Sequence, residues 1–263
     1  MDAEIGIICG TGIYSGDMLS DAETKKVSTP YGEPSSEIKI GTFRGRRVAF
    51  IFRHGEKHST PPHKVNYLAN IHALEELGVK MMIGITAVGS LKEEMKPGDI
   101  VIPDQFIDMT KSRPLTFYDG PKVAHISMAD PFCKNMRKIA NQVAEGLEMH
   151  HHKKGTYICV EGPRFSTRAE SNAWRIMKAE IIGMTLVPEV VLAREKELCY
   201  LSISSVTDYD CWRSADETVT ATNVIETMKK NTANIRKILE ALIPKLPGER
   251  DCECATALKN AFL

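Results

Sequence analysis

Short apolar runs that alternate with helix-like stretches constrain the fold of this chain more than any other feature. The clearest runs are I-G-I-I-C at 5–9, R-V-A-F-I-F at 47–52, M-M-I-G-I-T at 81–86 and L-C-Y-L-S-I-S-S-V at 198–206. Between them lie stretches with apolar residues at helical spacing, such as 66–77, which stops at Gly78. Strands that alternate with helices are typical of a mostly parallel sheet covered by helices. The sequence therefore predicts an α/β fold.

The same patterns predict the remaining elements. Further strands are expected at 100–107, 155–160 and 181–184, and further helices at 131–147, 168–177, 189–197 and 218–242. We see no internal repeat and no low-complexity linker, and 263 residues suit one large α/β domain. We therefore predict a single domain over 1–263, with a short tail at 247–263 that could form an extra helix.

Composition argues against several classes of protein. Lys plus Arg and Asp plus Glu both number 34, so the formal net charge is zero, whereas nucleic-acid binders usually carry a basic excess. No segment reaches the roughly 18 apolar residues of a membrane span. The N-terminus lacks the basic region and cleavage site of a signal peptide. We expect a cytoplasmic protein that binds neither nucleic acid nor a membrane.

Seven cysteines are scattered along the chain, and neither their odd number nor their spacing suggests a disulfide framework. Cys9, Cys159 and Cys199 lie in apolar runs and are expected to fill the core. Cys252 and Cys254 form a C-x-C pair near the C-terminus. A zinc site would want a second pair of ligands, and none is obvious. A redox-active or structural bond and two exposed thiols both stay open for this pair.

Polar side chains gather where the predicted strands end. In open α/β sheets, ligands bind outside the carboxyl ends of strands, so these side chains are predicted to meet at one site. The glycine-lined G-T-G turn at 10–12, the guanidinium of Arg53 and the imidazole of His54 suit a phosphate. Taken singly, each feature also fits a tight turn, a surface pair or a structural hydroxyl. The whole set is Thr11, Arg53, His54, Thr86, Thr185, Asp208 and Asp210.

Two carboxylates, Asp208 and Asp210, follow a run that is typical of a buried strand. On extended backbone, residues two apart point the same way, so both would face one ligand. An amino-substituted base donates from its N–H groups and suits such a pair. Carboxylates close together also raise each other's pKa, so that one can hold a proton and donate it. A solvated strand end with an N-cap is the alternative interpretation.

Longer motifs then appear in a fixed order: I-G-I-I-C-G-T-G, F-R-H-G-E-K-H, T-A-V-G-S-L-K-E-E-M-K-P-G-D, E-G-P-R-F-S-T-R-A-E-S, G-M-T-L-V-P-E-V-V and T-D-Y-D-C-W. Through them the chain, from Ile5 to about Leu246, resembles the 5′-methylthioadenosine phosphorylases, in the trimeric class of purine nucleoside phosphorylases. The resemblance implies one domain with a central mixed sheet flanked by helices. It implies a pentosyltransferase that cleaves 5′-methylthioadenosine with inorganic phosphate, in purine or methionine salvage, and that needs no metal or organic cofactor.

The resemblance also assigns roles to residues. Asp208, in its protonated form, would donate to N7 of the purine, and Asp210 would accept from the 6-amino group. The implied phosphate site consists of Thr11, Arg53, His54, Thr86, Ala87 and Thr185. The implied substrate contacts come from Phe165, Ser166, Met184, Asp208, Asp210, His125, Ala221, Val224 and Ile225.

Two of these assignments carry wider expectations. Ala221, Val224 and Ile225 would line the methylthio pocket, and Ala221 is smaller than the residue usual in the family, which predicts some cleavage of adenosine. His125 would reach the 5′ group of a neighbouring subunit, which predicts a trimer or a dimer of trimers. Cleavage of 6-oxopurine nucleosides, such as methylthioinosine or inosine, is one alternative function. A non-catalytic purine binder is another, although it would have no need of a phosphate site.

Overall fold

A computed structural model describes residues 2–10, 13, 18–213 and 220–262 of the chain. Its centre is an 11-stranded mixed sheet, with the path β2-β3-β4-β1-β5-β10-β9-β7 and a branch at β5 through β11 and β6 to β8. The strands are β1 Ile5–Cys9, β2 Ser20–Lys25, β3 Ile38–Phe43, β4 Arg46–Phe52, β5 Met81–Ser90, β6 Ile100–Val101, β7 Gln105–Met109, β8 His151–His152, β9 Thr156–Val160, β10 Ile181–Gly183 and β11 Cys199–Asp208.

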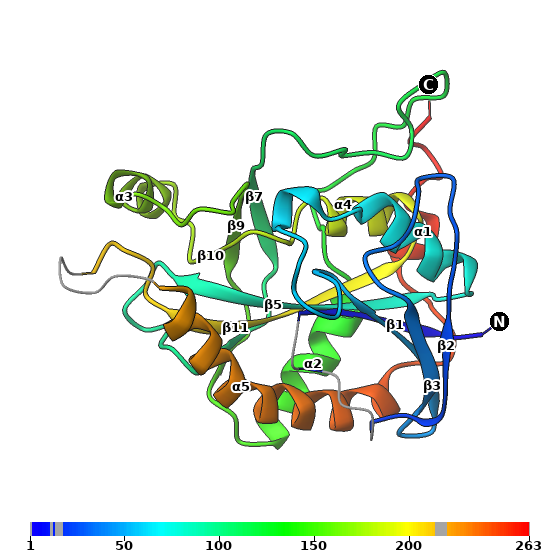
Figure 1. The fold of residues 1–263 in the computed structure, drawn as a ribbon, viewed down its shortest axis with the longest axis horizontal. Coiled ribbons are helices and arrows are strands. Elements are labelled where there is room, and N and C mark those ends of the chain that lie inside the picture. The colour runs from blue at the N-terminus through cyan, green and yellow to red at the C-terminus, as the bar shows by residue number, and fades with distance from the viewer. Residues whose placement is uncertain (1, 11–12, 14–17, 214–219, 263) are drawn as a thin grey trace.

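Helices cover both faces of the sheet (Figure 1). On one face, α5 (Ala221–Leu242) packs on β11 and α2 (Lys134–Gly146) packs on α5. On the other face, α1 (Tyr67–Glu76) packs on α4 (Glu189–Glu195), which in turn contacts β11. The remaining helix, α3 (Arg168–Ile176), projects beyond the ends of β9 and β10. No helix of the described residues is both long and apolar enough to cross a membrane.

Most of the predicted elements are confirmed. The strand at 5–9 and the helix at 66–77 are found with boundaries within a residue of those expected. Asn66 begins that helix because its side chain accepts a hydrogen bond, 3.1 Å long, from the backbone N–H of Ala69. The single-domain α/β architecture with a mixed central sheet is also as the family resemblance implied.

Three expectations about the elements are corrected. The run at 81–86 continues to Ser90, because β5 keeps pairing with β10 and β11 to its end. The strand expected at 100–107 is divided into β6 and β7 around Pro103, which has no N–H to donate to a ladder. The expected mostly parallel sheet is confirmed, since six of its ten strand pairings are parallel, and it is mixed because β3, β6 and β10 each run antiparallel to a neighbour. The tail forms only a short 3₁₀ turn, Glu253–Thr256, in place of a helix.

The sequence patterns miss three strands. The six residues of β2 are all exposed and mostly polar, so no apolar run marks the strand. Only two residues form β8. The third, β3, alternates I-K-I-G-T-F and is buried at most positions, so its period of two was a usable signal.

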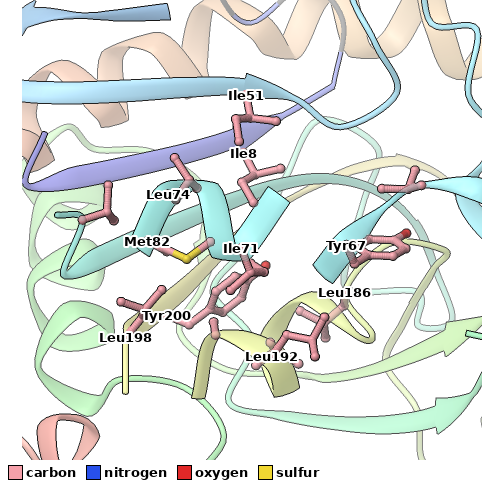
Figure 2. Close-up of a cluster of buried hydrophobic side chains, with 14 of the residues drawn as sticks. Ile8, Ile51, Tyr67, Ile71, Leu74, Met82, Leu186, Leu192, Leu198 and Tyr200 are labelled. Atoms are coloured by element: carbon pink, nitrogen blue, oxygen red, sulfur yellow. The ribbon is translucent and has the colours of Figure 1, made fainter. Parts of the chain in front are cut away.

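The core between the sheet and the α1–α4 layer is a continuous apolar cluster (Figure 2). Ile8 and Met82 of the sheet lie against Ile71 and Leu74 of α1 and Leu192 of α4, and all five side chains are fully buried. Burying an aliphatic side chain of this size contributes roughly 1.5–3 kcal/mol. This packing holds the ends of the central strands in fixed positions.

A buried ion pair joins the sheet to α4. The guanidinium of Arg53, directly after β4, binds Glu189 of α4 through two hydrogen bonds of 2.7 and 2.9 Å. It also donates to the carbonyls of Ile85 (3.0 Å) and Ile8 (3.3 Å), while the hydroxyl of Tyr200 donates to Glu189 at 2.6 Å. The network therefore connects β1, β4, β5, β11 and α4.

The same network explains why position 84 of β5 is a glycine. A Cβ atom at Gly84 of β5 would lie 2.0 Å from the hydroxyl of Tyr200 and 2.8 Å from a carboxylate oxygen of Glu189. No other residue leaves room for the pair at this point of the strand.

We predict that Glu189→Ala lowers the free energy of unfolding by about 3–5 kcal/mol, because it leaves the guanidinium of Arg53 buried and unpaired. Urea unfolding measures this loss. Asp130→Ala is the matched control, since its ion pair with Lys134 is more than half exposed on both sides and should contribute less than about 1 kcal/mol. Equal losses in the two variants would contradict the assignment.

Candidate active site

The strand directions bring the predicted site together. Because β1 runs parallel to β4 and β5, and β11 runs parallel to β5, the carboxyl ends of these four strands lie at one edge of the sheet. In contrast, β10 runs antiparallel to β5, with Ile182 opposite Gly89, so the chain after β10 returns alongside Thr86. Thr86 therefore lies within a strand, and Met184 and Thr185 reach it from the opposite direction.

A cavity of about 220 Å³ lies at this edge. Most of the residues predicted from the sequence line it: Arg53, His54, Thr86, Ala87, Phe165, Ser166, Met184, Thr185, Asp208, Asp210 and Val224. Thr11 lies outside the described residues, but its neighbour Gly10 lines the cavity.

Three predicted residues do not line the cavity of the single chain. His125 is exposed, and the sequence analysis assigned it to a neighbouring subunit's site. Ala221, at the first turn of α5, and Ile225 are exposed in the single chain, Ile225 to 51%, and their place in the methylthio pocket stays a prediction. The helix instead presents Val224, Met228 and Ile235 to the cavity. These residues are four and seven apart, so they share one face of the helix.

His54 is held as a neutral ring. Burial, together with the charge of Arg53, lowers the pKa of His54 from 6.5 to about 4. Its Nδ1 lies 2.8 Å from the carbonyl oxygen of Thr60. A carbonyl can only accept, so Nδ1 carries the proton and Nε2 is left as an acceptor. Near neutral pH the Nε2 of this ring can therefore accept a hydrogen bond from a P–OH group of phosphate, and it cannot donate one.

Arg53 has little donor capacity left for a ligand. Four of its five N–H groups are used by Glu189 and by the carbonyls of Ile8 and Ile85, which leaves one N–H on Nη1. The fork of Arg53 therefore faces Glu189 and can offer a phosphate at most one N–H group. The positive charge of Arg53 still lies beside the cavity.

Hydroxyl groups line the same side of the cavity. Thr86 on β5 donates to Ser204 on β11 at 3.0 Å, which fixes its rotamer. The amide of Asn231 on α5 donates to Ser205 at 2.6 Å and to the carbonyl of Val206 at 3.1 Å, so this helix is fixed against β11. Thr86, Thr185 and Ser205 all reach the cavity. Hydroxyls and backbone N–H groups of this kind suit an anion.

The two aspartates meet through a turn rather than along an extended strand. After Asp208 the chain enters the left-handed region at Asp210, whose φ is 50°. One oxygen of Asp208 accepts from the backbone N–H of Asp210 at 2.8 Å, and the other accepts from the hydroxyl of Thr207 at 2.7 Å. The expectation of extended backbone was wrong, but both carboxylates do line one cavity.

Burial raises the pKa of both carboxyl groups. Burial raises the pKa of Asp208, while its two hydrogen bonds act in the opposite direction. Burial also raises the pKa of Asp210; the hydroxyl of Ser171 acts in the opposite direction, and the neighbouring charge of Asp208 adds to the rise. Asp210 is 5% exposed, and its Oδ2 has no hydrogen-bond partner among the described residues. A buried carboxylate oxygen without a donor is costly unless a ligand supplies one.

Close packing leaves no spare room at this end of the cavity. A Cβ atom at Gly89 would lie 2.9 Å from Oδ1 of Asp208. Glycine at this position of β5 therefore allows the strand to approach the carboxylate. The G in T-A-V-G-S thus has a steric role in the site.

Several residues that line the cavity or position its side chains were not predicted from the sequence. Glu189 positions Arg53, and the available signal was a carboxylate at the start of an apolar helix, P-E-V-V-L. Arg113 positions Met184 by donating to its carbonyl at 2.7 Å, and it donates equally to the carbonyl of Glu161. His58 and Met228 line the cavity without any local signal, because only the fold brings them there.

Comparison with known proteins identifies the family. The family model described as "Phosphorylase superfamily" matches residues 4–244. The chain belongs to this superfamily. Among curated relatives, the S-methyl-5'-thioadenosine phosphorylases of Thermofilum pendens and Pyrococcus furiosus are each 58% identical over 260 residues. The alignments cover 99% of this chain, and 98% and 99% of the two relatives. The resemblance inferred from the motifs is thereby confirmed.

Solved structures agree with the relatives. A methylthioadenosine phosphorylase from an antarctic soil metagenomic library is 43% identical, with a TM-score of 0.94, over 100% of this chain and 93% of that one. The methylthioadenosine phosphorylase of Schistosoma mansoni in complex with adenine is 36% identical, with a TM-score of 0.91, over 98% and 96% of the two chains. The cavity described above therefore lies in a superfamily member with the superfamily's fold.

The environment of His54 predicts a pH dependence of stability. Between about pH 6.5 and 4 the ring of His54 binds a proton in the unfolded chain but not in the folded chain. The free energy of unfolding therefore falls as the pH falls through this window. The loss amounts to about 3 kcal/mol at pH 4 relative to pH 7. We expect urea unfolding to show that His54→Gln removes this part of the slope. Parallel pH profiles of the two proteins would refute the buried neutral ring.

Proposed function

We propose that this chain cleaves the N-glycosidic bond of 5′-methylthioadenosine with inorganic phosphate, releasing adenine and 5-methylthioribose 1-phosphate. The observation that carries the proposal is the unpartnered Oδ2 of Asp210, buried beside Asp208 in a cavity that also has hydroxyl groups and a cationic side chain. A base with an exocyclic amino group supplies the missing donor. The curated relatives named as S-methyl-5'-thioadenosine phosphorylases support the same substrate.

Asp208 and Asp210 would act together on the base. Asp210 accepts from the 6-amino group through Oδ2. Asp208, whose pKa is raised by burial, holds a proton and donates it to N7, so that adenine leaves as a neutral base. The hydrogen bond from the N–H of Asp210 to Asp208 fixes the spacing of the two carboxyl groups.

The hydroxyl side of the cavity would hold phosphate. Thr185 and the backbone at Ala87 donate to its oxygens, Thr86 can donate once its hydroxyl turns away from Ser204, Thr11 is proposed as a further donor, and the charge of Arg53 balances the anion. The Nε2 of neutral His54 accepts a hydrogen bond from the P–OH group of a monoprotonated phosphate, which orients the remaining oxygens toward C1′. As the bond to N9 breaks, the sugar develops oxocarbenium character, and a phosphate held against C1′ can add in place of water.

The rest of the substrate would contact apolar side chains. Phe165 and Ser166 lie against the base and ribose, and Met184, held by Arg113, packs on the ribose. Val224 and Met228 of α5 favour a methylthio group over a hydroxyl at the 5′ position. A hydroxyl is smaller than a methylthio group, so we also propose some cleavage of adenosine.

The proposal also covers the co-substrate, the oligomeric state and the location of the protein. Phosphate is a co-substrate, and the chemistry proposed here calls on no metal or organic cofactor. A trimer or a dimer of trimers, with His125 at a neighbouring subunit's 5′ pocket, and a cytoplasmic location stay predictions. The exposure of His125 in the single chain is compatible with that contact.

The alternative functions fit less well. A 6-oxopurine would present a carbonyl oxygen to the unpartnered oxygen of Asp210, so two acceptors would face each other. A purine binder without catalysis would not need the row of hydroxyls opposite the aspartates. Phosphate-dependent release of free base separates the enzyme from the binder.

We predict that Asp210→Asn shifts the preference from 6-amino toward 6-oxo substrates, because the amide can donate to a carbonyl. The ratio of kcat/KM for 5′-methylthioadenosine to kcat/KM for 5′-methylthioinosine should fall on the order of 100-fold. Steady-state assays with excess phosphate, following the free base, measure both values.

The matched control is Asp108→Asn, on β7 and outside the cavity, which should leave the ratio unchanged. A wild-type preference for methylthioinosine would reject the proposed substrate. Release of base without phosphate would reject the proposed co-substrate.

A further inference from the structure

A carboxylate and two imidazole rings meet outside the cavity, and we name this group the Asp99–histidine cluster. Asp99 directly precedes β6, and His150 and His152 lie at the neighbouring strand β8. Oδ1 of Asp99 lies 2.9 Å from Nδ1 of His150, and Oδ2 lies 2.9 Å from Nε2 of His152. The ligand atoms that the three side chains offer all lie within 4.8 Å of one another.

The pairing of β6 with β8 explains why these side chains meet. The two strands are parallel, with Ile100 opposite His151, and the N–H of Ile100 donates to the carbonyl of His150 at 3.4 Å. Residues two apart on a strand point to the same face, so His150 and His152 share one face of β8 and His151 points to the other. The strand pairing therefore brings both outer rings of the H-H-H run to the carboxylate of Asp99.

The spacing suits neighbouring positions around one octahedral metal ion. Ligand atoms that lie about 2.1 Å from an ion, at right angles to each other, are about 3.0 Å apart. Each carboxylate oxygen of Asp99 has an imidazole nitrogen at 2.9 Å, so an ion held by this carboxylate has a nitrogen ligand on each side. Imidazole suits zinc, iron and nickel, whereas calcium and magnesium prefer oxygen ligands.

The surroundings of Asp99 hold its carboxylate in place and leave one side of the cluster open. Oδ2 of Asp99 also accepts from the backbone N–H of Lys96 at 2.8 Å, and the side chain of Asp99 is only 10% exposed. Outer hydrogen bonds of this kind orient carboxylates that bind metals. The side chain of His150 is 72% exposed, so an ion and its water molecules can enter from solvent.

We propose that the Asp99–histidine cluster binds one divalent first-row transition-metal ion, with water in the remaining coordination positions. Each neutral ring binds through the nitrogen that faces Asp99 and carries its proton on the other ring nitrogen. No oxidation state changes. None of the three residues lines the cavity, so the site takes no part in phosphorolysis and stands or falls independently of the proposed function.

The competing arrangement is a cluster held by hydrogen bonds alone, in which each ring donates one N–H to Asp99. A distance of 2.9 Å satisfies such a bond as well as it satisfies a shared ion. The convergence of three ligands on one point, with the carboxylate held from behind and one side open to water, favours the ion. Metal titration separates the two arrangements.

The ion would stabilise a turn that is attached to β11. The carbonyl of Asp99 accepts from the N–H of Val206 at 2.9 Å, and the N–H of Gly98 donates to the carbonyl of Val206 at 2.9 Å. Val206 does not itself line the cavity. We therefore expect metal binding to raise the stability of the domain.

The first experiment titrates the full chain with Ni²⁺ by calorimetry, using protein made without a polyhistidine tag and cleared of metal on a chelating resin. We expect a Kd below about 100 µM. X-ray absorption at the nickel edge should show nitrogen and oxygen neighbours at about 2.1 Å, with the outer shells of imidazole. Weaker binding would overturn the proposal. A spectrum without imidazole shells, or one dominated by sulfur from the cysteines, would overturn it equally.

The second experiment compares variants. Asp99→Asn and His152→Gln each remove a ligand and should weaken Ni²⁺ binding by more than about 100-fold, since loss of an outer-shell partner alone typically costs about 10–100-fold. His151→Gln is the matched control, because the middle ring of the run points to the other face of β8. Its Kd should stay within about twofold of the wild-type value. Wild-type affinity in Asp99→Asn or His152→Gln would reject the site.

Melting temperatures provide an independent readout. Ni²⁺ at 100 times its Kd should raise the melting temperature of the wild type and of His151→Gln by roughly 5 °C, and should leave that of His152→Gln unchanged. An equal rise in all three proteins would contradict the proposed ligands. Where a variant fails to fold, the X-ray absorption spectrum of the wild type still decides between imidazole ligands and the alternatives.

Discussion

The buried ion pair between Arg53 and Glu189 is the interaction on which the rest of the structure depends. It joins the end of β4 to the start of α4 and uses the carbonyls of β1 and β5 as further acceptors. An unpaired charge at this depth would cost several kcal/mol, so these elements are held in one arrangement. The same pair keeps a positive charge beside the cavity and, with burial, keeps the ring of His54 neutral.

The cavity has two chemically different sides because strands of both directions meet at it. The parallel strands β1, β4 and β5 bring glycine, the cation and hydroxyls to one side, and β11 ends in the two carboxylates on the other. The antiparallel strand β10 closes the space between them by returning Met184 and Thr185 to β5. A ligand that carries an anion at one end and hydrogen-bond donors at the other matches this division.

Burial adjusts the protonation of the site in two opposite ways. It lowers the pKa of a histidine and raises that of a carboxyl group, because in both cases it disfavours the charged form. His54 is thereby left as an acceptor, and Asp208 is moved toward holding a proton.

The sequence by itself determined the α/β class, most helix and strand boundaries, the superfamily and most of the polar side chains that line the cavity. These follow from local periodicity and from motifs that occupy consecutive positions. Only the tertiary structure decided the partner of Arg53, the tautomer of His54, the turn that aims Asp210, the face of α5 that meets the cavity, and the meeting of Cys133 and Cys199 with the C-x-C pair. Most of these depend on contacts between residues far apart in the chain, and such contacts leave no periodic signal in a single sequence. The contacts of His54 with Thr60 and of Asp210 with Asp208 are local, but they lie in irregular turns that have no periodic pattern either.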